Sequence, residues 1–99
     1  MDIQFLYLGQ RFVWNLDKAS INVAKHGVAF EVACQIFFDP FVRLEDASAE
    51  AEQREAAIGL AEDWSLLCVV HILREGDAIR IISARPATAQ ERRNYEDSE

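Results

Sequence analysis

The alternation of hydrophobic and polar positions predicts two β-hairpins, one at the start of the chain and one in its second half. Residues 3–8 and 11–14 are short apolar runs on either side of a Gly-Gln pair, a spacing typical of a hairpin. The longest apolar run, 64–73, is rich in strand-forming residues. After a turn at 75–77 it is followed by the sequence AIRIISAR. We expect this second hairpin to form the centre of the sheet.

A helix is predicted directly after the first hairpin. Asn15 is a suitable N-cap, and Gly27 is a natural stop. Between them, four apolar residues recur at helical spacing, so we expect them to form a stripe that faces the core. This stripe consists of Leu16, Ala19, Val23 and Ala24.

Further elements follow from the same reasoning. A second helix is indicated by apolar residues at the same period from Phe30 to Phe37, and Asp39 and Pro40 end it. Short strands are expected at 42–44 and near 54–60. The acidic, alanine-rich stretch LEDASAEAEQREAA, which leads into the second of them, is consistent with either a helix or a loop. Near the C-terminus a capping box begins a short helix, formed by Thr88 and Glu91. We therefore predict one α+β domain over residues 1–99, with a mainly antiparallel sheet, two N-terminal helices and a short C-terminal helix.

The charge and the cysteines of the chain limit the classes of function that fit the sequence. The net charge of −7 argues against a protein that coats nucleic acid through a broadly basic surface. The segment 74–93 nevertheless contains five arginines, so an anion site would have to be local.

Cys34 and Cys68 lie in apolar runs and are expected to be buried thiols. The first ten residues resemble neither a signal peptide nor a membrane span, so we expect a cytoplasmic protein.

Two groups of polar residues are candidates for binding or chemistry. Lys18, Asn22, Lys25 and His26 fall along one face of the first predicted helix, although such a face is as often simply solvated. Arg80 lies among isoleucines in a predicted central strand, where a guanidinium needs an anionic partner or an open groove. An ion pair with an acid such as Glu52 or Glu55 is as consistent with this position as an anion site.

Other chemically capable residues have simpler explanations. His71 lies on an apolar strand face, which favours a hydrogen-bonded core residue over a catalyst. Glu91 is already accounted for as the acid of the capping box. The chain has no Gly-rich phosphate loop, no metal-binding motif and no serine or cysteine nucleophile with an evident base. The remaining Lys, His, Arg and Glu residues suit RNA cleavage by the substrate's own 2′-hydroxyl, without metal or cofactor.

Three segments, taken in order, resemble a known family. These are FVWNLDKASINVAKHGVAFEVACQIFFDP, EQREAAIG and VVHILREGDAIRIISARPATAQERRNY, which together extend from Phe12 to Tyr95 with gaps. Their most specific parts are KHGV followed by F, the FxDP segment, and IRIISAR leading to ER and Y. In this order they closely resemble the BrnT family of bacterial type II toxins.

The resemblance implies a RelE-like fold and an endoribonuclease that arrests translation. It also implies a BrnA-type antitoxin that neutralises the toxin and supplies the binding to operator DNA. His26 or Glu91 would then move protons, and the arginines would hold phosphates. The matching positions expected to be catalytic are Lys25, His26, Arg74, Arg80 and Glu91, and those expected to bind RNA are Lys18, Asn22, Arg54, Arg85 and Arg92.

Two expectations follow for the structure and the activity. If the chain is a nuclease, its cationic side chains from the early helix, the late strands and the final helix should converge on one pocket. The alternative is a protein of the same fold with weak or no activity, which acts by binding its antitoxin and tuning a promoter. The net negative charge motivates this second hypothesis.

Overall fold

The computed structural model describes residues 1–47, 53–73 and 75–97 and confirms an α+β protein. Within these residues there are six strands, three α-helices and two short 3₁₀ helices. The strands are β1 (Asp2–Tyr7), β2 (Gln10–Asn15), β3 (Arg43–Asp46), β4 (Glu55–Leu60), β5 (Leu66–Leu73) and β6 (Ile79–Pro86). The helices are α1 (Leu16–His26), α2 (Phe30–Ala33), η1 (Cys34–Phe38), η2 (Glu75–Asp77) and α3 (Ala89–Asp97).

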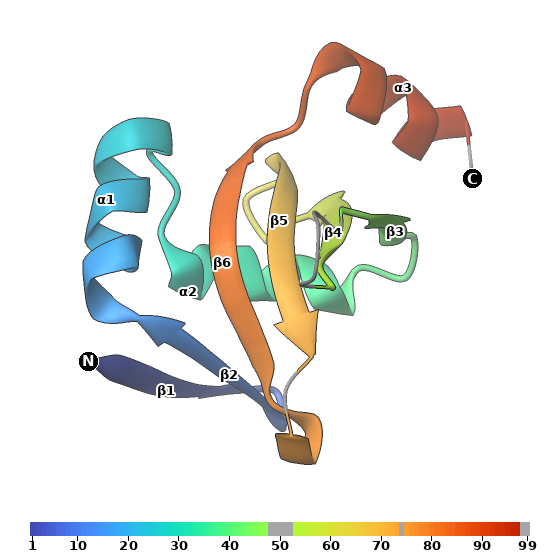
Figure 1. The fold of residues 1–99 in the computed structure, drawn as a ribbon. Coiled ribbons are helices and arrows are strands. Elements are labelled where there is room, and N and C mark those ends of the chain that lie inside the picture. Colours follow the sequence, from blue (N-terminus) through green and yellow to red (C-terminus); the bar gives the residue numbers. More distant parts are fainter. Residues whose placement is uncertain (48–52, 74, 98–99) are drawn as a thin grey trace.

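The strands form one mainly antiparallel sheet in the order β1-β2-β6-β5-β4-β3. Both predicted hairpins are present, and β5 and β6 lie at the centre of the sheet as expected. The exception to antiparallel pairing is the short contact between β2 and β6, which are parallel. Through this contact, the N-terminal hairpin extends the sheet beyond β6 (Figure 1).

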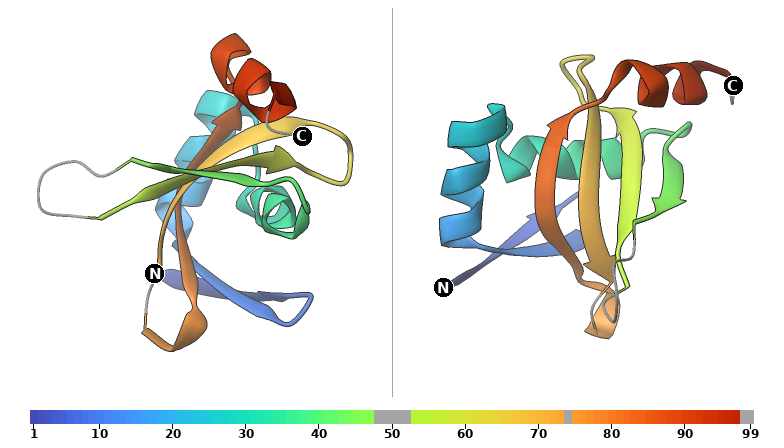
Figure 2. Two further views of the ribbon diagram at one scale, coloured as in Figure 1. Left: turned by 90° about the vertical axis from the view of Figure 1, so that its right-hand side faces the viewer. Right: turned by 45° about the horizontal axis from the view of Figure 1, so that its top comes forward.

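The main core lies on the face of the sheet that α2 and η1 cover, here called the helix face. Figure 1 shows α2 passing behind β6 and β5. Phe12 and Trp14 of β2 are almost fully buried there, and the Trp14 ring meets Phe30 edge to face at 5.8 Å. Burial of each such side chain stabilises the fold by about 1.5–3 kcal/mol. The opposite face, here called the open face, is covered by α3 at one end, where Tyr95 is buried (Figure 2).

An irregularity in β6 determines which of its side chains reach the open face. The pairing with β5 shifts between Val70 and His71, so that Val70 pairs with Ser83 whereas His71 pairs with Ile81. Ile82 is therefore an extra residue, a β-bulge. Because of this bulge, Ile81 and Ala84 both lie on the helix face, although they are three residues apart.

Helix α1 has the predicted ends but not the predicted buried side. The Asn15 side chain accepts a hydrogen bond from the Lys18 backbone N–H, and Gly27 ends the helix with a φ of 72°. The predicted apolar stripe is wrong, because Leu16 and Val23 are 44% and 47% exposed. Ala24 is exposed as well, and of the four only Ala19 is partly buried.

The side of α1 that is buried instead carries Asn22, which is 5% exposed. Strand β2 reaches β6 only at Ile79 and Arg80, so the later part of β6 has no neighbouring strand on that side. There the Asn22 amide donates to the carbonyls of Val28 and Ala84 and accepts from the Ala84 N–H. A polar residue is buried at this position because the backbone of β6 requires hydrogen-bond partners.

Two other predicted boundaries are corrected. The second helix is not continuous, since four residues of α-helix pass into the 3₁₀ helix η1 before Asp39. Strand β5 begins at Leu66, two residues later than the apolar run, and Trp64 lies in a turn with a φ of 70° and 80% exposure. In the part of the chain that the structure describes, no helix is long and apolar enough to cross a membrane.

Candidate functional site

The predicted site residues divide into groups and do not share one pocket. Arg85, Glu91 and Arg92 lie where β6 ends and α3 begins. Lys25 and His26 lie at the C-terminal end of α1, which Asn22 attaches to the same part of β6. Arg80 lies at the other end of β6, beside the N-terminal hairpin. The expected convergence of these side chains on one pocket is therefore only partial, because Arg80 and the other groups lie at opposite ends of the eight-residue strand β6.

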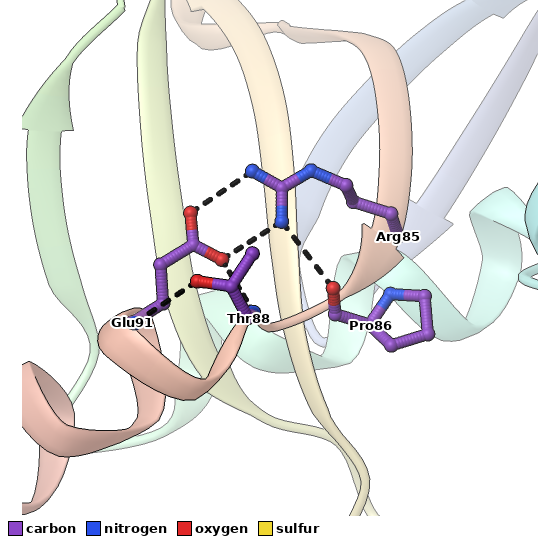
Figure 3. Close-up of polar contacts among 4 residues, drawn as sticks. All are labelled: Arg85, Pro86, Thr88 and Glu91. Atoms are coloured by element: carbon purple, nitrogen blue, oxygen red, sulfur yellow. Dashed lines mark hydrogen bonds and ion pairs between the residues drawn. The ribbon is translucent and has the colours of Figure 1, made fainter.

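Arg85 and Glu91 form a two-pronged ion pair between β6 and α3 (Figure 3). The two guanidinium Nη atoms donate to the two carboxylate oxygens at 2.8 and 2.9 Å, and Nη1 also donates to the Pro86 carbonyl at 3.3 Å. Glu91 completes the predicted capping box, because its Oε1 accepts from the Thr88 N–H and Thr88 Oγ1 accepts from the Glu91 N–H. The start of α3 thus fixes the direction of the Arg85 side chain.

These contacts determine the chemistry available to Glu91. The hydrogen bonds from Arg85 lower the pKa of its carboxyl group to about 2. A carboxylate with so low a pKa is a weak base at neutral pH and has no proton to donate. The geometry therefore favours a positioning role for Glu91 over the proton transfer that the sequence suggested. The Arg85 guanidinium, whose pKa is raised by the same hydrogen bonds, stays charged and is 37% exposed.

Arg80 is paired with an acid that the sequence did not suggest. Its Nη1 and Nη2 donate to the two carboxylate oxygens of Asp2 at 3.3 and 2.6 Å. Of the two acids considered earlier, Glu55 bonds to His71, and Glu52 lies outside the described residues. The alternating pattern of β1 could have indicated that Asp2 lies on the exposed face, because Asp2 falls on the same side of the strand as Gln4 and Leu6.

Arg80 and Arg85 nevertheless lie on the same open face. Arg80 pairs with Ile72 and Arg85 pairs with Cys68, and side chains directly opposite in an antiparallel sheet point to the same side. Ile72 and Cys68 are four residues apart in β5, so the two arginines are separated by roughly 13 Å along the sheet. Without the bulge at Ile82, an odd spacing in β6 would place them on opposite faces.

The cationic residues of α1 differ in their surroundings. Lys18 and Lys25 are exposed, and His26 is partly buried. Asn22, the uncharged residue predicted on the same face, does not face solvent as an RNA-binding residue would, because its amide is buried and bonded to backbone groups. The face of α1 that was predicted to be polar and exposed is therefore partly buried.

The remaining predicted residues lie elsewhere. Arg54 precedes β4 and lines a cavity of about 390 Å³ with Glu45, Asp46 and Glu55, far along the sheet from α3. Arg74 is outside the described residues. Arg92 is exposed on α3.

The prediction that His71 is a hydrogen-bonded core residue is confirmed. It is 2% exposed, with Nδ1 3.2 Å from the Val69 carbonyl oxygen and Nε2 3.2 Å from Glu55 Oε1. Its ring also meets Phe37 edge to face at 4.8 Å. In the described ranges, no group of three or more His, Cys, Asp or Glu side chains is arranged to hold a metal ion.

A comparison with protein families identifies the class of protein. Residues 14–91 match the family model described as ribonuclease toxin, BrnT, of type II toxin-antitoxin system. Because the match covers most of the chain, this protein belongs to the BrnT family of ribonuclease toxins. An antitoxin is thus its expected partner. A search among curated proteins found no match.

Proposed function

We propose that this protein is a metal-independent endoribonuclease in which the RNA supplies its own nucleophile. The observation that carries the proposal is the placement of Arg80 and Arg85 on one open face of the sheet, with Arg85 held by Glu91. Guanidinium groups bind phosphate oxygens through two parallel hydrogen bonds, so both arginines suit the RNA backbone. We further propose that residues 1–99 form a single domain with a RelE-like fold.

The proposed reaction is an internal transesterification. The 2′-oxygen attacks the adjacent phosphorus and loses its proton, the bond from phosphorus to the 5′-oxygen breaks, and that oxygen gains a proton. The products are a 2′,3′-cyclic phosphate and a 5′-hydroxyl. Two protons have to be moved, and the negative charge that develops on the phosphorane has to be offset.

Each group at the α3 end of β6 has a proposed task. Arg85, oriented by Glu91, stabilises the charge on the phosphorane. His26 and Lys25, at the nearby end of α1, exchange the two protons, since an imidazole both accepts and donates protons near neutral pH. Lys18, Arg54, Arg74, Arg80 and Arg92 are proposed to contact the RNA backbone. Asn22 is proposed to support the fold only.

The biological setting follows from the family. We propose that the protein acts in the cytoplasm, where cleavage of RNA arrests translation, and has no membrane partner. A BrnA-type antitoxin is the proposed neutralising partner. Operator DNA would be bound only by the complex, through the antitoxin, since the toxin itself carries a net charge of −7.

The test is RNA cleavage by antitoxin-free protein in the presence of EDTA. We expect products that end in a 2′,3′-cyclic phosphate, and no cleavage at a linkage whose 2′-hydroxyl is replaced by hydrogen. Arg85→Ala should lower the rate by about 10²-fold or more. Arg43→Ala is a suitable control, because Arg43 pairs with Glu45 on the edge strand β3. Intact RNA at high protein concentration, or equal rates for wild type and Arg80→Ala, would contradict the proposal.

The alternative of a weakly active interaction protein is favoured by one observation. Each of the two arginines on the open face is already paired with a carboxylate, Arg80 with Asp2 and Arg85 with Glu91. Expression without the antitoxin separates the two functions. Normal growth together with nanomolar binding to the antitoxin would support the alternative, whereas growth arrest that is lost in Arg85→Ala would support the nuclease.

A further inference from the structure

A cavity of about 400 Å³ opens beside Arg80, between β1, β2 and β6. It is lined by Arg11 and Arg80 as well as by Asp2, Gln4 and Val13. Because Val13 pairs with both Gln4 and Arg80, the three side chains lie in one row across the open face. The Arg80 side chain therefore extends across β2 to reach Asp2 in β1. We propose that this cavity binds a phosphodiester of the RNA backbone and that the Asp2 carboxylate occupies it until RNA displaces it.

The contact between Arg80 and Asp2 resembles the contact that a phosphate would make. Two carboxylate oxygens accept from the two Nη atoms, which is also the geometry in which arginine binds phosphate. The Asp2 side chain is 49% exposed, whereas the Arg80 side chain is only 20% exposed. The acid therefore lies at the opening of the cavity, and the guanidinium lies deeper inside.

Asp2 does not satisfy the whole guanidinium. The Nε of Arg80 is buried and has no hydrogen-bond acceptor among the residues that the structure describes. An unsatisfied buried donor costs about 1–3 kcal/mol, so Asp2 is an incomplete partner. A phosphodiester has more acceptor oxygens than a carboxylate and would also approach the second cation, Arg11.

Arg11 gives the cavity a charge that Asp2 alone does not cancel. It lies on the same face as Val13, two residues earlier in β2, and its side chain is exposed. Within the described part of the chain, it makes no ion pair. When Asp2 moves aside, two guanidinium groups face the cavity with no carboxylate between them.

The position of Asp2 allows it to be displaced. Strand β1 is at the edge of the sheet and the Asp2 side chain is 49% exposed, so water can solvate the carboxylate when it leaves Arg80. Asp2 and Arg11 both lie outside the matched residues 14–91, whereas Arg80 lies within them. The N-terminal hairpin thus adds a competing acid and a second cation beside an arginine of the family region. This inference rests on the proposed ribonuclease function and concerns how RNA reaches it.

The test measures binding to RNA that cannot be cleaved. A fluorescent single-stranded oligonucleotide with 2′-O-methyl groups lacks the nucleophile, so its anisotropy reports binding alone. We expect Asp2→Asn to lower the Kd about fivefold at low salt, and less at high salt. Glu31→Gln removes one negative charge from an exposed position of α2, far from the cavity in sequence, and is the matched control. It should leave the Kd within about twofold.

The double variant Asp2→Asn with Arg80→Ala should show no gain over Arg80→Ala alone. Equal gains in Asp2→Asn and Glu31→Gln, a gain that persists without Arg80, or no binding by any variant would overturn the inference. The separate cleavage assay distinguishes the two proposals. If wild type cleaves RNA but Asp2→Asn leaves the Kd unchanged, only the inference is refuted. If Asp2→Asn lowers the Kd, this effect requires Arg80, and no variant cleaves RNA, only the nuclease proposal is refuted.

Discussion

Gly59 of β4 and Ile36 of η1 pack so closely that a side chain at position 59 has no room. A β-carbon on Gly59 would lie 3.0 Å from the Ile36 carbonyl oxygen, 3.2 Å from Ile36 Cβ and 3.3 Å from Val42 Cγ2. The nearest of these atoms belongs to the backbone, so it cannot move away by a change of rotamer. The close packing of η1 on the helix face therefore depends on a glycine in β4.

Gly59→Ala should destabilise the protein by about 1–3 kcal/mol, because η1 has to shift away from the sheet. The free energy of unfolding in urea measures this effect. Ser20→Ala, at an exposed position of α1, is the control and should change stability by less than about 0.5 kcal/mol. A Gly59→Ala protein as stable as wild type would show that the two elements are not in tight contact.

Asn22→Ala should be among the more harmful substitutions in α1, although alanine favours helices. It would remove three hydrogen bonds to the backbone of Val28 and Ala84, made at 2.8–3.1 Å, and leave those groups buried. We expect a loss of about 3 kcal/mol in urea unfolding. Lys18→Ala, on the exposed side, should have little effect on stability. If Lys18→Ala were as harmful as Asn22→Ala, the anchoring role would be refuted.

Acid should weaken the contact between Arg85 and Glu91. Because the folded-state pKa of Glu91 is about 2 and its ordinary value is 4.5, its stabilising contribution is complete above pH 4.5. It is lost as the pH falls from 4.5 towards 2. Allowing for the solvent exposure of Arg85, we expect wild type to lose about 1–2 kcal/mol more than Glu91→Gln over this range. Urea unfolding at several pH values compares the two proteins, and parallel curves would contradict the prediction.

Both cysteines should resist alkylation while the protein is folded. Burial is the main cause that raises the pKa of Cys34 to about 12 and that of Cys68 to about 11. At pH 8 the reactive thiolate is therefore on the order of a thousandth of the Cys68 thiol and a ten-thousandth of the Cys34 thiol. Mass spectrometry after iodoacetamide treatment should find no modification in buffer and two modifications in urea. Rapid labelling of either cysteine in the folded protein would show that it is accessible.

Elements with strong local signals were predictable from sequence. The hairpin of β5 and β6, the cap at Asn15, the stop at Gly27 and the capping box of Glu91 all depend on residues close together in the chain. Both cysteines are buried as predicted, and the family was correctly recognised from its motifs.

The misplaced features depend on contacts between distant segments. The burial of Asn22 is set by where β2 leaves β6, and helical periodicity contains no information about that contact. The pairing of Arg80 with Asp2 joins the central strand β6 to the edge strand β1 across β2. Likewise, the bulge at Ile82 alters the alternation of β6 without a glycine or proline to mark it. These three features determine how the candidate site residues are arranged. The sequence therefore predicted the local elements that carry these residues better than their arrangement in space.

The parallel contact between β2 and β6 also limits the stage of folding at which the sheet of the toxin is completed. Only Phe12 with Ile79 and Val13 with Arg80 are in register there, and they join the beginning of the chain to a region near its end. Such a connection closes late in folding, because a long loop has to be ordered first. A nascent chain that has not yet released residue 80 from the ribosome therefore cannot assemble the cavity beside Arg80. The surface proposed to bind RNA can therefore form only after most of the chain has been synthesised.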